Sequence, residues 1–349
     1  MSKVIKVGIC SFGMSGQIFH APFIHVNPNF EFTAVVERSK HLAAAKYPGV
    51  KVYASVDDMV KDPALDLIVV NTPNYTHYDY AKTALDAGKH VVVEKPFTVH
   101  NQEAQELIEL AASKGLLLSV YHNRRYDSDY KVVKSVVDSG VLGDVLEFEV
   151  HYDRFKEELS YKKHKEENLP GTGALYDLGS HLIDQALTIF GMPRKLWADI
   201  RIIRKDSIVD DYFELVLYYD FLRVRLKSSY LVREPLPAYQ VHGRIGSFIK
   251  SKSDIQEAQL QRGLMPNSPD WGAEAPHEWG LLHTTINGKT VKEYVPGGNG
   301  NYMDYYNGIY EAIVNGAPNP VPAVDGANVV RVIEAAFESS NSGKVVPIH

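Results

Sequence analysis

The sequence has almost no cysteine, and Cys10 is the only one among its 349 residues. An internal disulfide and a cysteine zinc cluster are therefore excluded, because both need more than one thiol. Long hydrophobic runs are also missing, since runs such as 67–70 and 91–93 are far too short to cross a bilayer. Residues 1–16 lack the charged and apolar regions of a secretory signal peptide. We therefore expect a cytoplasmic protein with no membrane partner.

The sequence also has little excess charge. Its 37 Lys and Arg residues face 43 Asp and Glu residues, so the formal net charge is -6. A nucleic-acid partner is not expected, because domains that bind nucleic acids carry a basic surface. Hydrophobic residues make up 45% of the chain and charged residues 23%, as in ordinary globular proteins. A chain of this length usually forms more than one core, which predicts two domains.

The first 120 residues alternate short β-rich runs with helical segments. Strands are expected at six places: 4–10, 32–36, 51–53, 66–71, 90–94 and 116–120. The run 66–71 is almost continuously apolar, as in a parallel sheet that is covered on both faces. Six strands separated by helices predict a doubly wound parallel sheet of the Rossmann type.

After residue 120 the pattern changes to neighbouring strands with the helices kept apart. A long strand is expected at 145–155, and several strand-like runs follow between 195 and 250. Asn287-Gly288 predicts a hairpin turn between strands at 282–286 and 290–295. This order favours an α+β domain on a largely antiparallel open sheet. We therefore predict two domains, 1–120 and 121–349.

The turn after the first strand has the form S-x-G-x-x-G. It contains Ser11, Phe12, Gly13, Met14 and Gly16. Gly13 would let the backbone approach a pyrophosphate, and Gly16 would let the helix pack closely on the strand. Ser11 replaces the first glycine of the usual fingerprint, and such a loop on its own is often coincidence. Its place between a strand and a helix, at the start of a six-strand pattern, favours a dinucleotide site.

Glu37 and Arg38 follow the second strand, about 20 residues after Gly16. The Glu37 carboxylate could accept hydrogen bonds from the hydroxyls of the adenosine ribose, which favours NAD. Arg38 could stack on the adenine or meet the 2′-phosphate of NADP. The alternative is a solvated pair of charges at a strand end. A helix is expected over 39–46, with Ser39 as its N-cap.

Two further features could carry chemistry. Lys95 lies in Glu94-Lys95-Pro96, after the fifth strand, where ligands of open α/β sheets bind. A partly desolvated lysine can exchange a proton with a substrate hydroxyl, although a surface lysine is the common alternative. Asp177 and His181 are four residues apart and should project from one helical face. His181 could act as a general base that Asp177 orients, or the two could be a helix cap and a core histidine.

One face of the strand at 145–155 ends in polar groups. Leu146, Phe148, Val150, Tyr152 and Arg154 share this face by the alternation of a strand. An arginine on an apolar face needs a partner, so Tyr152 and Arg154 are candidates to contact a polyhydroxylated substrate. An arginine at a frayed strand end is the alternative.

With these features together, the sequence resembles the Gfo/Idh/MocA (glucose–fructose oxidoreductase/inositol dehydrogenase) family over essentially its whole length. The motifs that carry the resemblance are SFGMSG, NTPNYTH, GKHVVVEKPFT, YHNRRYD and YDLGSHLIDQAL. FHAPF and QVHGRIGSFIK are similar to the scyllo-inositol dehydrogenase branch. In that branch, members that prefer NADP carry a small residue before the arginine, where this chain has Glu37.

The resemblance implies a role for particular residues. Lys95, Asp177 and His181 match the catalytic lysine, aspartate and histidine of the family. The positions that match the nicotinamide end of the site are Thr72, Pro73, Asn74, His77, Glu94, Lys95 and Asn123, and Asn123 also faces the substrate side. The first domain is then the NAD(P)-binding domain, and the second binds substrate and forms a homodimer or homotetramer.

The activity implied is hydride transfer between a nicotinamide cofactor and a secondary alcohol or ketone of a cyclic polyol or sugar. His181 would take the hydroxyl proton with help from Lys95. NAD is the expected cofactor, NADP is possible, and no metal is expected. Two other readings stay open, a catalytically silent sugar or nucleotide sensor on the same fold and a reductase of another carbonyl substrate.

Overall fold

A computed structural model describes residues 3–39, 41–160 and 165–348 of the chain. The chain forms two compact units. Unit 1 contains Met1–Asn123, Gln256–Trp271 and Asn301–Ala327, and unit 2 contains Arg124–Ile255, Gly272–Gly300 and Asn328–His349. Two segments from the range expected to form the second domain, Gln256–Trp271 and Asn301–Ala327, thus belong to unit 1.

The core of unit 1 is a parallel sheet of six strands in the order β3-β2-β1-β4-β5-β6. The strands are β1 (Ile5–Ile9), β2 (Phe30–Val36), β3 (Lys51–Tyr53), β4 (Leu67–Val70), β5 (His90–Val93) and β6 (Leu118–Val120). Every residue of β4 is buried, as expected for a strand covered on both faces. The predicted doubly wound sheet is therefore confirmed. Its order reverses between β1 and β4, the point at which such sheets bind ligands.

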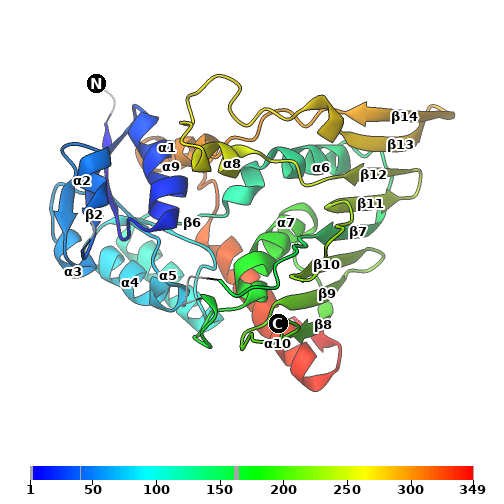
Figure 1. The fold of residues 1–349 in the computed structure, drawn as a ribbon, viewed down its shortest axis with the longest axis horizontal. Helices are drawn as coiled ribbons and strands as arrows, with labels where there is room; N and C mark the ends of the chain where they lie inside the picture. The colour runs from blue at the N-terminus through cyan, green and yellow to red at the C-terminus, as the bar shows by residue number, and fades with distance from the viewer. Residues whose placement is uncertain (1–2, 40, 161–164, 349) are drawn as a thin grey trace. The chain divides into compact units, whose positions relative to one another are not determined.

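Short helices connect these strands on the blue-to-cyan part of the chain (Figure 1). They are the π-helical η1 (Gly16–His20), α1 (Ala21–Val26), α2 (Leu42–Lys46), α3 (Val56–Met59), η2 (Asn74–Thr76), α4 (His77–Asp86) and α5 (Asn101–Lys114). Helix α5 is capped by Gly115, whose φ of 63° is left-handed, a conformation that glycine adopts without strain.

The two later segments of unit 1 pack on these helices and on the sheet. They carry α8 (Gln256–Gln261) and α9 (Met303–Asn315). The ring of Tyr306 stacks on that of Phe23 with centroids 6.2 Å apart, and the Asn27 side chain donates a hydrogen bond to Asn307. The Val120 N–H donates to the carbonyl of Val321 beside β6. These contacts explain why the late segments belong to the first unit.

Unit 2 is built on a sheet of nine strands in the order β14-β13-β12-β11-β7-β10-β9-β8-β15. The strands are β7 (Val145–His151), β8 (Lys195–Arg201), β9 (Tyr212–Tyr218), β10 (Arg223–Ser229), β11 (Tyr239–Gly243), β12 (Gly246–Lys250), β13 (Gly280–Ile286), β14 (Lys289–Val295) and β15 (Val346–Pro347). Only β7 and β10 pair in parallel among the described neighbours, which confirms the largely antiparallel sheet. Asn287 and Gly288 both have positive φ between β13 and β14, as the predicted hairpin requires.

Helices pack on one face of this sheet. They are α6 (Ser128–Asp138), the π-helical η5 (Leu175–Gly179), α7 (Ser180–Phe190) and α10 (Ala323–Ser342), which begins in unit 1. Figure 1 shows α6 beside β12 and α7 beside β10, and both pairs are in contact. Phe213, Leu215 and Leu217 of β9 are fully buried, whereas the residues between them are only partly covered. The second face of the sheet is therefore the more open one.

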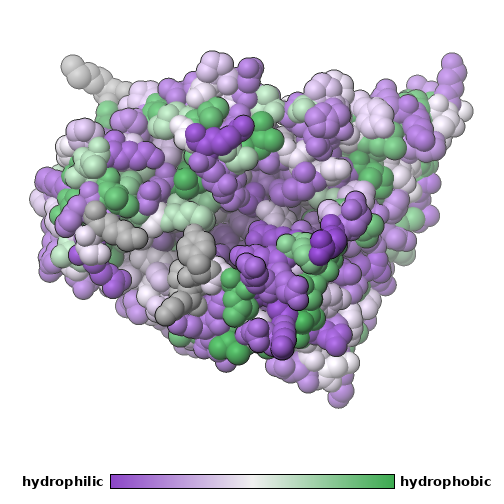
Figure 2. All heavy atoms as spheres, in the orientation of Figure 1, coloured by the Kyte–Doolittle hydropathy of each residue, from purple (hydrophilic) through white to green (hydrophobic). Residues whose placement is uncertain are grey.

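Polar and apolar residues are interspersed on the visible surface (Figure 2). No helix within the described residues is long and apolar enough to span a membrane.

Candidate active site

The S-x-G-x-x-G turn is tightly built in unit 1. The Gly13 N–H donates to Ser11 Oγ at 3.2 Å, and the Asn71 side chain donates to the Ser11 carbonyl at 2.8 Å. A Cβ added at Gly16 would lie 2.2 Å from that same carbonyl oxygen, so only glycine fits there. Phe12 is buried against Phe32, which leaves its backbone as the part that could face a ligand.

Asn71 offers a second sign of a ligand at this turn. Its Nδ2 also donates to Ser15 Oγ at 3.1 Å, but its buried Oδ1 has no hydrogen-bond partner within the described residues. A buried acceptor without a donor costs free energy unless a ligand or water satisfies it. Asn71 directly follows β4, which pairs with β1 where the order of the sheet reverses. A dinucleotide would therefore fit this cradle.

Glu37 has a local partner that the sequence did not reveal. Its buried carboxylate accepts the N–H groups of Leu42 at 3.0 Å and Ala43 at 2.8 Å, at the start of α2. The prediction that Ser39 is the N-cap of this helix is wrong, because α2 begins only at Leu42 and Glu37 satisfies its first N–H groups. Arg38 is exposed beside it.

The loop from Thr72 to His77 follows β4. The hydroxyls of Thr72 and Thr76 lie 2.6 Å apart, and the ring nitrogens of His77 lie 2.8 Å and 2.9 Å from the carbonyl oxygens of Pro96 and Thr72. Burial lowers the pKa of His77, although the two carbonyls oppose this shift. The fully buried His77 therefore links this loop to the one after β5. Pro73 and Asn74 lie at the start of η2 in the same loop.

Glu94 and Lys95 leave the carboxyl end of β5, and the Lys95–Pro96 bond is cis. Glu94 Oε1 lies 3.0 Å from Nε2 of His20, and Glu94 Oε2 accepts the backbone N–H of Lys95 at 3.1 Å. Burial alone would raise the pKa of Glu94, but His20, Lys95 and His77 together hold that pKa below its usual value. Glu94 is therefore ionised. Lys95 is half-buried, and Asn123 is buried just after β6.

Asp177 and His181 lie in unit 2, at the covered face of its sheet. Asp177 belongs to the π-helical η5 and the buried His181 to the first turn of α7, so they do not share one regular α-helix. Asp177 Oδ2 lies 2.8 Å from Lys165 Nζ, and this carboxylate raises the pKa of Lys165. Lys165 was missed in the sequence because it lies in an irregular segment with no motif.

The ring of Tyr152 gathers three cationic side chains in unit 2. The centroid distances are 5.4 Å for Arg154, 5.6 Å for Arg124 and 5.2 Å for Lys252. The Arg154 guanidinium also lies 5.9 Å from the ring of Tyr230. The two predicted substrate residues therefore lie together, although β7 ends at His151, before Tyr152. Arg124 and Lys252 were missed, although both lie in or beside quoted motifs, NRRYD and GSFIK.

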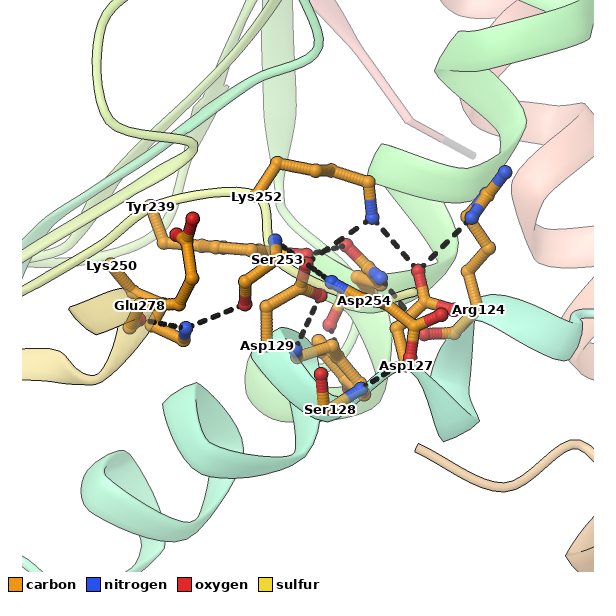
Figure 3. A network of polar contacts seen from close by, with 12 residues as sticks. Arg124, Asp127, Ser128, Asp129, Tyr239, Lys250, Lys252, Ser253, Asp254 and Glu278 are labelled. Atoms are coloured by element: carbon orange, nitrogen blue, oxygen red, sulfur yellow. Dashed lines mark hydrogen bonds and ion pairs between the residues drawn. The ribbon is translucent and has the colours of Figure 1, made fainter. Parts of the chain in front are cut away.

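Buried carboxylates hold Lys252 and Arg124 in place (Figure 3). Lys252 Nζ lies 2.9 Å from Asp127 and 3.3 Å from Asp129, and Arg124 pairs with Asp127 at 3.2 Å. Although desolvation opposes its charge, Asp127 and Asp129 hold the pKa of Lys252 well above its usual value. Lys252 is therefore a permanent hydrogen-bond donor.

Asp254 belongs to the same network. Its Oδ2 accepts the N–H of Ser128 at 2.9 Å. Burial, together with the charges of Asp127 and Asp129, raises the pKa of Asp254 to about 7. The described residues contain no group of three or more His, Cys, Asp or Glu side chains that could hold a metal ion.

Comparison with known proteins gives a consistent result for both parts of the chain. Residues 5–122 match the NAD-binding Rossmann fold of an oxidoreductase family, and residues 134–348 match the C-terminal α/β domain of the same family. Scyllo-inositol 2-dehydrogenase (NADP+) IolW of Bacillus subtilis is 40% identical over 343 residues, which cover 98% of this chain and 95% of the relative.

Solved structures agree with the fold. The crystal structure of a protein from Bacteroides fragilis has 46% sequence identity and a TM-score of 0.90. The match covers 99% of this chain and 100% of that chain. An oxidoreductase from Bacillus cereus is 34% identical with a TM-score of 0.91, and the match covers 99% of each chain.

Proposed function

Because the chain belongs to the Gfo/Idh/MocA oxidoreductase family, we propose that it transfers a hydride between a nicotinamide cofactor and a secondary alcohol or ketone of a cyclic polyol or sugar. The observation that supports this most is the tight turn at Ser11–Gly16, which lies beside the unsatisfied Asn71 Oδ1. A cyclic polyol is the favoured substrate class because the similar IolW is named for scyllo-inositol.

Residues of unit 1 would hold the cofactor. The backbone of Ser11, Gly13 and Gly16 would face its pyrophosphate, with Phe12 and Met14 in the same turn. The nicotinamide end would lie against the loop Thr72–His77, Glu94 and Asn123. When bound, the nicotinamide ring supplies the carbon that takes or gives the hydride. A homodimer or homotetramer in the cytoplasm is the expected form of the enzyme.

Residues of both units would serve the reaction. We assign to His181 the removal of the hydroxyl proton during oxidation and to Lys95 a hydrogen bond that assists it. Asp177, which has Lys165 as its ion-pair partner, would support the charged form of His181. Tyr152 and Arg154, together with Asn123, would bind the hydroxyl groups of the substrate.

The presence of a glutamate at position 37 restricts the cofactor to NAD less than the sequence alone suggests. Both oxygens of its carboxylate already accept backbone N–H groups of α2, and the similar IolW is named for NADP+. Arg38 is exposed next to it and carries the charge that a 2′-phosphate needs. We therefore expect the protein to use NAD(H) and to accept NADP(H).

The decisive experiment measures turnover on a panel of polyols and sugars, with scyllo-inositol first, using NAD+ and NADP+. Lys95→Met should reduce turnover on the best substrate by about 10²–10⁴-fold, because proton-transfer groups contribute rates of this order. NADH affinity of the apoprotein should stay within a few-fold of the wild type.

Lys61→Met is the matched control, because Lys61 is an exposed lysine of unit 1 whose ion pair, among the described residues, is with Asp58 on α3. It should leave turnover unchanged. Near-normal turnover of Lys95→Met would show that Lys95 is a surface lysine. NADH binding without turnover on any substrate would favour the silent sensor.

A further inference from the structure

We propose that His20 is a positioning residue that fixes the Glu94 carboxylate as the acceptor for the ribose next to the nicotinamide. The proposal rests on the proposed function, since it concerns the same cofactor. His20 belongs to the FHAPF motif, and none of the roles given above uses it. All residues concerned lie in unit 1.

His20 is held from both sides of its ring. It ends η1, its side chain is fully buried, and its Nε2 lies 3.0 Å from Glu94 Oε1. Its Nδ1 lies 2.7 Å from the hydroxyl of Tyr306 on α9, and its ring packs on Tyr121 with centroids 4.5 Å apart. With both nitrogens bonded and one face covered, the ring has a single orientation.

The charge of Glu94 fixes the direction of these hydrogen bonds. A carboxylate with a lowered pKa is ionised and can only accept, so Nε2 of His20 must carry the proton that faces it. The Nδ1 atom on the other side of the ring contacts the Tyr306 hydroxyl, which can either donate to Nδ1 or accept from it. Nε2 of His20 is therefore the donor in the contact with Glu94, and the Glu94 carboxylate is the acceptor.

Glu94 keeps acceptor capacity that the described residues do not use. An ionised carboxylate has about four lone-pair positions. The structure fills one with His20 and one with the backbone N–H of Lys95. The Glu94 side chain keeps 13% of its surface exposed at the carboxyl end of β5, the edge where such sheets bind ligands.

The two hydroxyls of a ribose match this open edge, because vicinal hydroxyls can donate to one carboxylate together. Without His20 the carboxylate would be free to turn toward other donors, and its remaining lone pairs would no longer face the ligand. Loss of His20 should therefore weaken ligands that have this ribose and spare ligands that lack it.

The test compares NADH with ADP, which shares its adenosine and pyrophosphate but lacks the second ribose. Binding of both to the apoprotein is measured by calorimetry. His20→Asn should weaken NADH about tenfold, as expected for a lost hydrogen bond to a charged group, and change ADP by less than about twofold. His20→Gln, whose longer amide can still donate to Glu94, should bind NADH within about threefold of the wild type.

His90→Asn is the matched control. His90 begins β5 at the opposite end from Glu94, where its Nδ1 accepts the N–H of Leu117. This variant should lower the melting temperature and leave the ratio of the NADH and ADP affinities unchanged. If His20→Asn does not fold, Tyr306→Phe carries the test, with a selective loss of NADH affinity of about threefold.

An equal loss for NADH and ADP in the His20 or Tyr306 variant, or no loss for either, would overturn the role of His20. Wild-type protein that binds ADP and not NADH would overturn the proposed function, and this proposal with it. The two failures are therefore distinguishable.

Discussion

Glu37 has two possible partners, and the structure describes one of them. Its carboxylate accepts the N–H groups of Leu42 and Ala43, which would otherwise lack partners at the start of α2. Glu37→Gln should therefore lower the free energy of unfolding by about 1 kcal/mol, the usual effect of a weakened helix cap. The ratio of NADPH to NADH affinity should change by less than about threefold. Chemical denaturation and calorimetry measure the two quantities.

Glu31→Gln is the control for this variant, because Glu31 is an exposed residue of the same strand. It should change neither quantity. A gain of tenfold or more in the relative affinity for NADPH in Glu37→Gln would show instead that the carboxylate meets the adenosine ribose.

For single residues, the sequence predicts which side chains belong to the candidate site better than it predicts their hydrogen-bond partners. Glu94-Lys95-Pro96 is recognisable because it follows a strand and matches a family motif. The partners of Glu94 are not, since His20 is 74 residues away and reaches it only through the fold. Whether Lys95, Asp177 and His181 act as the resemblance implies stays a prediction.

At the scale of the elements, Asp254 links the loop after β12 to the start of α6, where it accepts the N–H of Ser128. Its pKa of about 7 in the folded protein exceeds the ordinary value of an aspartate. The folded state therefore binds the proton more tightly, and the stability that this proton contributes is lost as the pH rises through 7. Between pH 5 and pH 8, Asp254→Asn should gain about 2 kcal/mol in free energy of unfolding relative to the wild type.

Urea denaturation at the two pH values measures this gain. The control is Asp206→Asn, because Asp206 is an exposed aspartate of the same unit. Its difference from the wild type should be the same at both pH values. A gain for Asp254→Asn that does not depend on pH would mean that the carboxyl group is ionised in the folded protein throughout this range.

Most elements could be predicted because their signals are local. The six strands of the first sheet and the Asn287-Gly288 hairpin follow from apolar runs and turn residues. The π-helical turns η1 and η5 could not be predicted, since an inserted residue in a helix is favoured by what packs around it. The strand predicted at 145–155 ends earlier, at His151, although the Tyr152 and Arg154 N–H groups beyond it still donate to the carbonyls of Lys227 and Ser229 in β10.

At the scale of the whole molecule, the proposed function assigns Lys95 and His181 to one reaction. If Lys95 of unit 1 and His181 of unit 2 serve the same step, their effects on turnover should not add. Lys95→Met combined with His181→Ala should then be less than about tenfold slower than the worse single variant. Rates are normalised to folded, NADH-binding protein.

Arg233→Gln is the control for this double variant, because Arg233 is an exposed side chain of unit 2 that lies over the ring of Phe155. Its effect should simply add to that of Lys95→Met. Effects of Lys95→Met and His181→Ala that multiply in the double variant would show that the two residues act in separate steps.

No local sequence pattern predicts which segments of the chain make up each unit. The change of rhythm near residue 120 marks the end of the parallel sheet correctly, since its last strand ends at Val120. The return of 256–271 and 301–327 to unit 1 depends on pairs such as Phe23 and Tyr306, whose matching surfaces are far apart in the sequence.

This return has a consequence for synthesis. About 200 residues separate Asn123, where the first segment of unit 1 ends, from Ala327, where its last segment ends. A ribosome that adds about 5–20 residues per second needs on the order of 10–40 s for that distance. During this time the nascent Rossmann sheet has neither Tyr306 for His20 nor Val321 for the edge of β6, so the unit whose strands are made first must wait for residues made about 200 positions later.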